Sequence, residues 1–147
     1  MSISNIFDIA GSGMSAQSIR LNTTASNIAN AESVSSSIDE TYRARHPVFA
    51  VALQQAQGFD NANQALQRSA GRGVEVTGIV ESQAPLRPQY QPNHPMANEE
   101  GFVFYPNVNV VEEMTNMISA SRSFQTSADI MNTAKEMTQR VLTLGQG

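Results

Sequence analysis

Apolar residues recur at alternating steps of four and three along the first part of the chain. The row consists of Ile3, Phe7, Ala10, Met14, Gln17, Leu21, Thr24 and Ile28. Such a step keeps one face of an α-helix apolar and is typical of a coiled-coil seam. The pattern therefore predicts one helix over residues 4–31, with two polar positions in its seam.

Two glycines, Gly11 and Gly13, fall inside this predicted helix. Each is expected to cost about 1 kcal/mol relative to alanine in a helix interior. Two interpretations stay open. Either the glycines let a neighbouring backbone come close, or they mark a bend or a frayed helix end.

The same four–three step returns near the other end of the chain. It runs through Val110, Met114, Met117, Ser121, Phe124, Ala128, Met131, Lys135, Thr138 and Leu142, with Ile118 widening the stripe. Asn109 and Glu112 resemble a capping box, and Gly145 is a natural stop. We predict a helix over residues 110–144 that pairs with the first, antiparallel or nearly so, as a two-stranded coiled coil.

Between the two helices the pattern changes to short runs of β-branched and aromatic residues. Residues 42–53, 74–82 and 102–106 are predicted strands, and Gly78 indicates a β-bulge in the second of them. Residues 31–41 are expected to form a loop. A solvated loop or a short helix is expected over residues 54–73, and an extended irregular segment over the proline-rich residues 83–101.

The predicted fold class is therefore mainly α with a small β unit (α+β). The N- and C-terminal helices pair as a coiled coil, and short strands and long loops lie between them. The corresponding division of the chain is residues 1–33, residues 34–108 and residues 109–147.

The first helix contains almost no charge, since Asp8 and Arg20 are its only ionisable residues. Of the 147 residues of the chain, 15 % are charged, against about a quarter in an average globular protein. Asparagine, serine and threonine form hydrogen bonds without a charge that must be desolvated. A helix of this kind fits a position surrounded by other protein, or is marginal and disordered when alone.

Composition and motifs argue against catalysis, metal binding and nucleic-acid binding. A net charge of −4 argues against a nucleic-acid ligand, because neutralising phosphates requires clustered lysine and arginine. The chain has no cysteine, which excludes disulfides, thiol nucleophiles and zinc–thiolate sites. His46 and His94 each precede proline in extended segments, and we interpret them as loop residues rather than metal ligands. We predict no catalytic residue, no cofactor, no metal, no membrane span and no secretory signal peptide.

Four segments resemble a known family. They are PNVNVVEEMTNMISASRSFQTSADIMNTAKEMTQRVLTLGQG at residues 106–147, LNTTASNIANAES at residues 21–33, YRARHPVF at residues 42–49 and GVEVTGIVES at residues 73–82. They are similar to the proximal rod proteins of the bacterial flagellar basal body, the FlgC type of the axial rod and hook family. The resemblance covers most of the chain.

The resemblance implies a non-enzymatic structural subunit. Such proteins leave the cytoplasm unfolded through the flagellar type III secretion channel, without cleavage, and assemble helically in the periplasm. The terminal helices would form the innermost layer around the channel, and residues 34–108 the outer layer. The implied partners are other rod proteins, copies of the same chain, and the export gate and membrane-ring components at the rod base.

For helix packing and assembly, the residues expected to contribute are Ile3, Phe7, Met14, Leu21, Asn27, Ile28, Asn30, Val110, Met114, Met117, Ile118, Phe124, Met131 and Leu142. The alternative function is that of a soluble cytoplasmic coiled-coil adaptor or export chaperone. A metal-dependent enzyme that uses His46 or His94 is a third and remote alternative.

Overall fold

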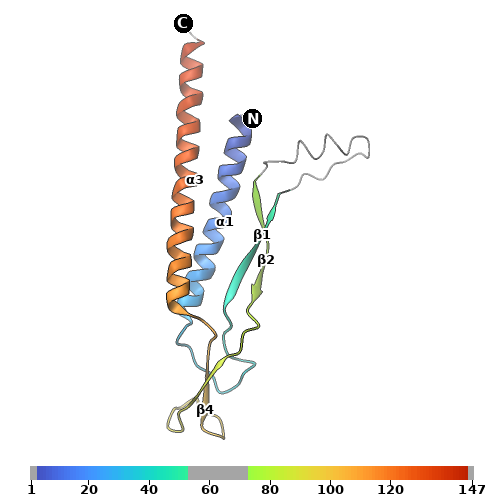
Figure 1. Ribbon diagram of the computed structural model, residues 1–147, viewed down its shortest axis with the longest axis vertical. Helices are drawn as coiled ribbons and strands as arrows, with labels where there is room; N and C mark the ends of the chain where they lie inside the picture. The colour runs from blue at the N-terminus through green and yellow to red at the C-terminus, as the bar shows by residue number, and fades with distance from the viewer. Residues whose placement is uncertain (1–2, 53–72, 146–147) are drawn as a thin grey trace, which may run out of the picture.

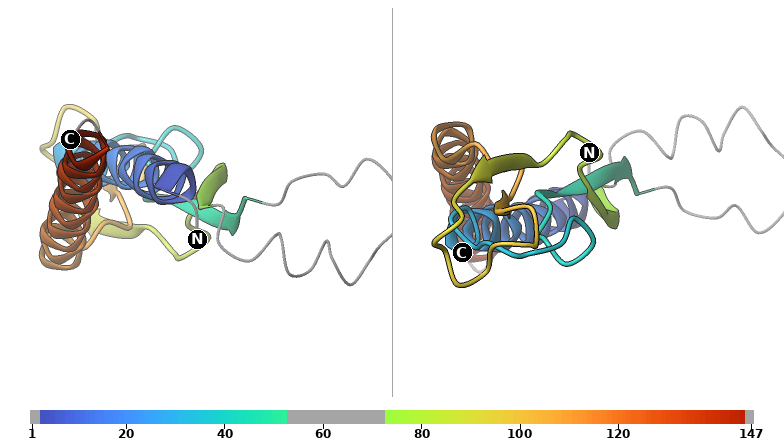
Figure 2. Two further views of the ribbon diagram at one scale, coloured as in Figure 1. Left: turned by 90° about the horizontal axis from the view of Figure 1, so that it is seen from above. Right: turned by 90° about the horizontal axis from the view of Figure 1, so that it is seen from below.

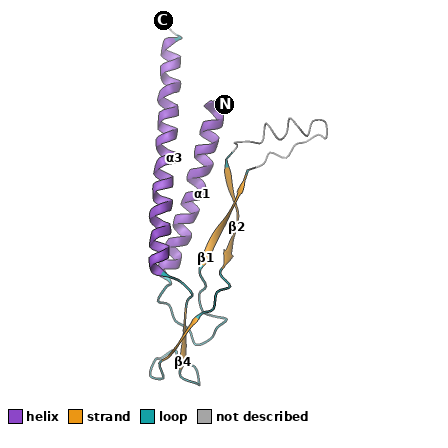
Figure 3. Cartoon of the chain, in the orientation of Figure 1, coloured by secondary structure: helices purple, strands orange, loops and turns teal. Residues whose placement is uncertain are grey.

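Two long helices and two small sheets make up the computed structural model, which describes residues 3–52 and 73–145 (Figure 3). The elements are α1 (Ile3–Ala29), β1 (Arg45–Val51), β2 (Val74–Glu81), β3 (Arg87–Tyr90), β4 (Phe102–Tyr105) and α3 (Val110–Leu144). The predicted α+β fold with paired terminal helices is confirmed. The expectation for residues 54–73 lies outside the described residues, except for Gly73.

Both helices end close to their predicted limits. Helix α3 has the predicted bounds, and the Asn109 side chain accepts hydrogen bonds from the Val111 and Glu112 amides as its N-cap. Helix α1 ends two residues earlier than predicted, at Ala29. There the Ala31 amide bonds to the Ile28 carbonyl, so the last turn tightens to the three-residue spacing that often closes an α-helix.

The two helices lie side by side and run in opposite directions, as predicted (Figure 1). Helix α1 continues through both of its glycines, and both face α3. A Cβ atom on Gly11 would lie 3.7 Å from the Met131 methyl group, and one on Gly13 would lie 3.3 Å from the Ser127 hydroxyl. The glycines therefore do not mark a frayed helix end, and the atoms that each lets come close belong to side chains of α3 rather than to its backbone.

Strands β1 and β2 form an antiparallel ribbon, which we call the arm. Val48 pairs with Gly78 and Phe49 pairs with Val76, so Thr77 is an extra residue on β2. The bulge predicted at Gly78 is therefore present beside it. The arm contacts α1, and α1 lies between α3 and the arm (Figure 2).

Strands β3 and β4 form the second sheet, below the helices in Figure 1. Strand β4 was predicted, but β3 falls in the segment expected to be irregular, and that expectation was wrong for residues 87–90. Pro88 lacks an N–H group, yet β3 has only one neighbouring strand, and proline is tolerated in such an edge strand. On the other edge of β4, the Ser35 amide donates to the Phe104 carbonyl, and the Phe104 amide donates to the Ser35 carbonyl.

Small side chains dominate the interior. The buried apolar residues in the helices are Ala10, Ala16, Ala120 and Ala134, and the largest buried aliphatic side chains elsewhere are Val103 and Val108. Alanine permits close helix packing but removes little apolar surface from water, and hydrophobic stabilisation scales with that surface. The described part of the chain therefore has a weak core for its length.

Candidate assembly interface

The face of α3 that meets α1 is formed by small and half-buried residues. Ala120 and Ala134 are buried, and Met117, Phe124 and Met131 are half-buried. The last three belong to the predicted seam. Ala120 lies between the first two of them and Ala134 follows the third, at turns where the sequence pattern placed Ser121 and Lys135. The seam is therefore shifted by one residue at alternate turns.

This shift leaves several predicted packing residues on the outside of the helix pair. Met114 and Leu142 are 53 % and 62 % exposed, so their predicted place in the α1–α3 seam was wrong. At Met114 the buried position is taken by its neighbour Glu113. Leu142 lies in the last turn of α3, and this end of the helix extends past the N-terminus of α1 (Figure 1). A contact of the Met114 and Leu142 side chains with a neighbouring subunit stays a prediction.

Large apolar side chains stay exposed along α3. We call this set the outer α3 row; it consists of Val111, Met114, Ile118, Ile130, Met137, Val141, Leu142 and Leu144, all between 48 % and 83 % exposed. At 3.6 residues per turn, Val111, Met114 and Ile118 share one side of α3, and Ile130, Met137 and Val141 share another. Among the described elements, α3 packs only against α1, and its C-terminal end extends past the N-terminus of α1 (Figure 1). Extended apolar surfaces of this kind mark interaction sites in soluble proteins.

A groove of about 370 Å³ runs along the upper half of the helix pair. Its lining comes almost entirely from α3, with Ile6 as the contribution of α1. The lining residues are Ile6, Thr126, Asp129, Ile130, Thr133, Ala134 and Met137. The groove is thus continuous with the outer α3 row and offers a place for an apolar side chain of a neighbour.

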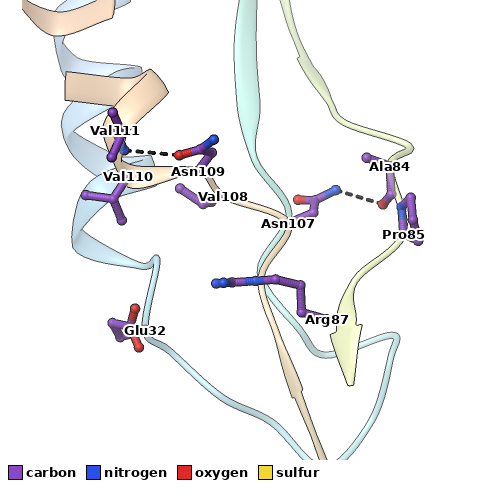
Figure 4. A pocket seen from close by; sticks show the side chains of 9 residues that line it. All are labelled: Glu32, Ala84, Pro85, Arg87, Asn107, Val108, Asn109, Val110 and Val111. Carbon is purple, nitrogen blue, oxygen red and sulfur yellow. Dashed lines mark hydrogen bonds between the residues drawn. The ribbon is translucent and has the colours of Figure 1, made fainter. Parts of the chain in front are cut away.

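A second groove, of about 650 Å³, lies at the lower end of the helix pair (Figure 4). Val108, Val110 and Val111 give it an apolar wall, while Glu32 and Arg87 add one charge of each sign. The remaining lining residues are Ala84, Pro85, Asn107 and Asn109. The first turn of α3 therefore borders a mixed apolar and charged surface, unlike the apolar groove higher up.

The residues predicted on α1 are mostly covered within the chain. Ile3 is the first residue of the helix, and Phe7, Met14, Leu21 and Ile28 are half-buried. Of the α3 residues in that set, Val110 is half-buried and Ile118 is 55 % exposed. The apolar face of α1 is thus mostly covered within the subunit, whereas many apolar side chains of α3 are exposed.

Asn27 is fully buried and bonded within the chain. Its Oδ1 accepts hydrogen bonds from the Tyr42 hydroxyl at 2.8 Å and the Arg45 amide at 2.9 Å. Its Nδ2 donates to the Arg45 carbonyl at 2.8 Å. Asn30, half-buried, donates to the Ser26 carbonyl. The motif from which we predicted assembly contacts thus has a role inside the subunit, and contacts of Asn27 or Asn30 with neighbours stay predictions.

The histidines are placed as loop and strand residues. His46 is exposed, and the His94 Nδ1 accepts a hydrogen bond from the Met96 amide at 3.1 Å. Within residues 3–52 and 73–145, no three histidine or acidic side chains gather as metal ligands. Over the same residues, neither helix has an apolar stretch long enough to cross a membrane.

Comparison with known proteins assigns a class to this arrangement. The model of the family described as flagella basal body rod protein matches residues 7–34, and that of the flagellar basal body rod FlgEFG protein C-terminal family matches residues 99–144. These matches cover most of α1 and all of α3. The two ends of the chain thus match the models of flagellar basal-body rod proteins, a structural and non-enzymatic class.

Full-length relatives make the assignment specific. The chain is 47 % identical to the flagellar basal-body rod protein FlgC of Salmonella typhimurium over 146 residues, 99 % of this chain and 100 % of the relative. It is 48 % identical to that of Yersinia enterocolitica over the same shares of the two chains, and 32 % identical to that of Borreliella burgdorferi over the whole of both. The chain belongs to the FlgC family, the structural subunits of the proximal rod.

The upper end of the arm is fixed to α1 at a point that requires glycine. The Ser12 hydroxyl accepts a hydrogen bond from the Val74 amide at 3.2 Å and donates to the Ile9 carbonyl at 3.0 Å. Gly73 has φ +111°, and a Cβ atom there would collide with the Ser12 side chain. Only glycine adopts this backbone readily, so the contact depends on the residue at position 73.

We expect Gly73→Val to reduce swimming strongly, because backbone strain of about 1–3 kcal/mol adds to the collision with Ser12. The measurement is the spread in soft agar of a strain that lacks the native gene and carries the variant. Gly78→Ala is the matched control, since Gly78 is a glycine of the same arm, within β2, and open space surrounds it. Equal spreading of the two strains would show that the contact between α1 and the arm is dispensable.

Proposed function

We propose that this chain assembles helically, with copies of itself and with other rod proteins, into the drive shaft of the flagellum. The shaft transmits torque from the membrane ring to the hook and encloses the export channel. In this proposal residues 1–33 and 109–147 form the inner layer around the channel, and residues 34–108 lie outside it.

The outer α3 row is the observation that carries the proposal. A helix with one face on α1 and large apolar side chains on its remaining surface has substantial area left to bury. When that area meets a different surface of the next subunit, the contact is heterologous, and its repetition generates a helical filament. The groove at the lower end of the helix pair, whose lining is mostly outside the outer α3 row, supplies such a different surface.

The scarcity of charge along α1 suits a wall around a channel. Asp8 and Arg20 are the only ionisable residues in α1, and Arg20 donates to the Asn116 side chain of α3 at 2.9 Å. Fixed charges on such a wall would attract oppositely charged segments of a passing unfolded chain. A channel lined by uncharged side chains lets different chains pass without holding them.

Export and location follow from the same proposal. The subunit would leave the cytoplasm unfolded and uncleaved through the flagellar type III channel, and fold in the periplasm as it joins the growing rod. At the rod base its neighbours would be the export gate and the membrane-ring components. Family membership supports this route, because rod subunits add to a structure outside the inner membrane.

Cell fractionation tests the proposal against the cytoplasmic adaptor or chaperone. We expect the chain to be enriched in purified basal bodies, and to accumulate in the cytoplasm of a strain whose flagellar export gate is deleted. A functional tagged copy and a cytoplasmic marker protein serve as controls. Retention in the cytoplasm of swimming cells, with none in basal bodies, would establish the adaptor alternative.

A further inference from the structure

Two asparagines from different ends of the chain meet at the root of the arm. Ala44 directly precedes β1 and Arg45 is its first residue. Their successive amide groups point in opposite directions, as in any extended chain. The Arg45 amide donates to Asn27 Oδ1 at 2.9 Å, and the Ala44 amide donates to Asn107 Oδ1 at 2.8 Å. Asn27 belongs to α1, and Asn107 precedes α3.

The same two side chains also donate hydrogen bonds. Asn27 Nδ2 donates to the Arg45 carbonyl at 2.8 Å. Asn107 Nδ2 donates to the Ala84 carbonyl at 2.8 Å and to the Ser82 carbonyl at 3.3 Å, just beyond β2 (Figure 4 shows the bond to Ala84). The two asparagines thus bond backbone groups at the root of both strands, and we call them the asparagine clasp.

The asparagine clasp lies beside a small apolar cluster to which both helix ends contribute. Ala31 follows α1, Ala44 leads into β1 and Val108 precedes α3, and all three are at most 4 % exposed. Tyr42 and Val110 pack against them. This cluster holds Asn27 and Asn107 on opposite sides of Ala44 and Arg45. Both asparagines can therefore bond the start of β1 only when the ends of α1 and α3 lie together.

We propose that the asparagine clasp makes the direction of the arm conditional on the pairing of α1 with α3. The role rests on the proposed function, in which the subunit folds as it assembles. A subunit with separated helices would keep the bonds of Asn27 and Ser12 between the arm and α1 but would lack the Asn107 side of the clasp, so its arm would be held less firmly. A subunit with paired helices would present the arm to its neighbour in a single orientation. Asn27 and Asn107 are therefore positioning residues for assembly.

The chemistry of the clasp requires an amide. Each side chain accepts with its oxygen and donates with its nitrogen. Aspartate has nearly the same shape, but it would place a second oxygen against the Arg45 or Ala84 carbonyl. At Asn27, which is 0 % exposed, it would also bury a charge without a cationic partner. Aspartate is thus a substitution that removes the donor function and changes the volume very little.

Both faces of the arm that the clasp orients carry exposed apolar side chains, since neighbouring residues of a strand point to opposite faces. Val48, Phe49, Ile79 and Val80 in the arm are between 39 % and 53 % exposed. A two-stranded ribbon alone is at best marginally stable in water. Its attachment to the helices therefore decides where these faces point, and the clasp and the Ser12 contact provide the hydrogen bonds of that attachment.

The test uses photo-cross-linking in assembled basal bodies. A photoreactive amino acid replaces Val80 in the arm or Met137 in the outer α3 row, and the adducts with neighbouring rod subunits are quantified. We expect Asn27→Asp and Asn107→Asp each to lower the Val80 adduct about tenfold, the effect of losing a buried hydrogen bond. The Met137 adduct should stay within about twofold, because the helix pair does not need the clasp in order to assemble. Asn22→Asp, an exposed change on α1, is the matched control and should leave both adducts unchanged.

The double variant tests the dependence of one side of the clasp on the other. If both asparagines must be in place, the double variant should give about as much Val80 adduct as either single variant. If the two effects were independent, they would multiply to a loss of about a hundredfold. A hundredfold loss of the Val80 adduct in the double variant would overturn this inference and leave the proposed function unaffected. An unchanged Val80 adduct in the single variants would do the same. Loss of the Met137 adduct in the single variants would also overturn it, by showing that the asparagines hold the helix pair. Absence of both adducts with the native asparagines would instead contradict the proposed function.

Discussion

Leu142→Asp and Met137→Asp should each abolish swimming and stop rod growth while the protein is still produced. Both side chains are about 60 % exposed in the single chain, so neither substitution should disturb the packing of α1 on α3. In the proposed rod, each would place a carboxylate in an apolar contact between subunits, and burying an unpaired charge costs several kcal/mol or more. Because the contact repeats along the shaft, the loss recurs at every subunit.

The comparison uses soft-agar motility, immunoblots of whole cells and electron microscopy of basal bodies. Gln139→Asp is the matched control, since Gln139 is an exposed polar residue of α3, and this variant should swim normally. Met117→Asp should also prevent rod growth, but Met117 is half-buried against α1, so its effect combines folding and assembly. Normal swimming with both Leu142→Asp and Met137→Asp would contradict the proposed use of the outer α3 row.

Dilute purified protein should contain far less helix than the 27 residues of α1 and the 35 residues of α3. The reason is the composition of the core. Ordering each residue costs about 1–2 kcal/mol of backbone entropy, and the buried apolar side chains of the helices are alanines. An isolated pair of helices with so little buried surface depends on further contacts for its stability.

Circular dichroism at increasing protein concentration measures this effect. We expect low helix content at micromolar concentration or below, a gradual thermal transition, and a rise in helix content where copies associate. A dilute monomer with the full helix content and a sharp cooperative melting transition would show that the chain needs no neighbours to fold. The rod proposal would then lose its argument from burial, although the exposed outer α3 row would remain.

The sequence predicted those features that depend on local order. The four–three step, with Asn109 before it and Gly145 after it, predicted the bounds of α3, because an N-cap side chain bonds the first turn of its own helix. Short runs of β-branched and aromatic residues predicted β1, β2 and β4. Gly78 predicted a bulge in β2, next to the position where it occurs. In all these cases the interacting groups lie within a few residues of one another, so a short window contains the information.

The tertiary structure decided which element covers each surface. Strand β3 depends on β4, and Asn27 finds its partners at Tyr42 and Arg45, which no helical period indicates. The seam shifts to Ala120 and Ala134 because the closeness of α1, rather than the hydrophobicity of each residue, selects the contact face. Helix α1 is poor in charge partly because α3 and the arm of the same chain lie on either side of it. A periodic pattern defines a face, but the identity of its partner is set by segments far away in the sequence, through distances that only the folded chain fixes.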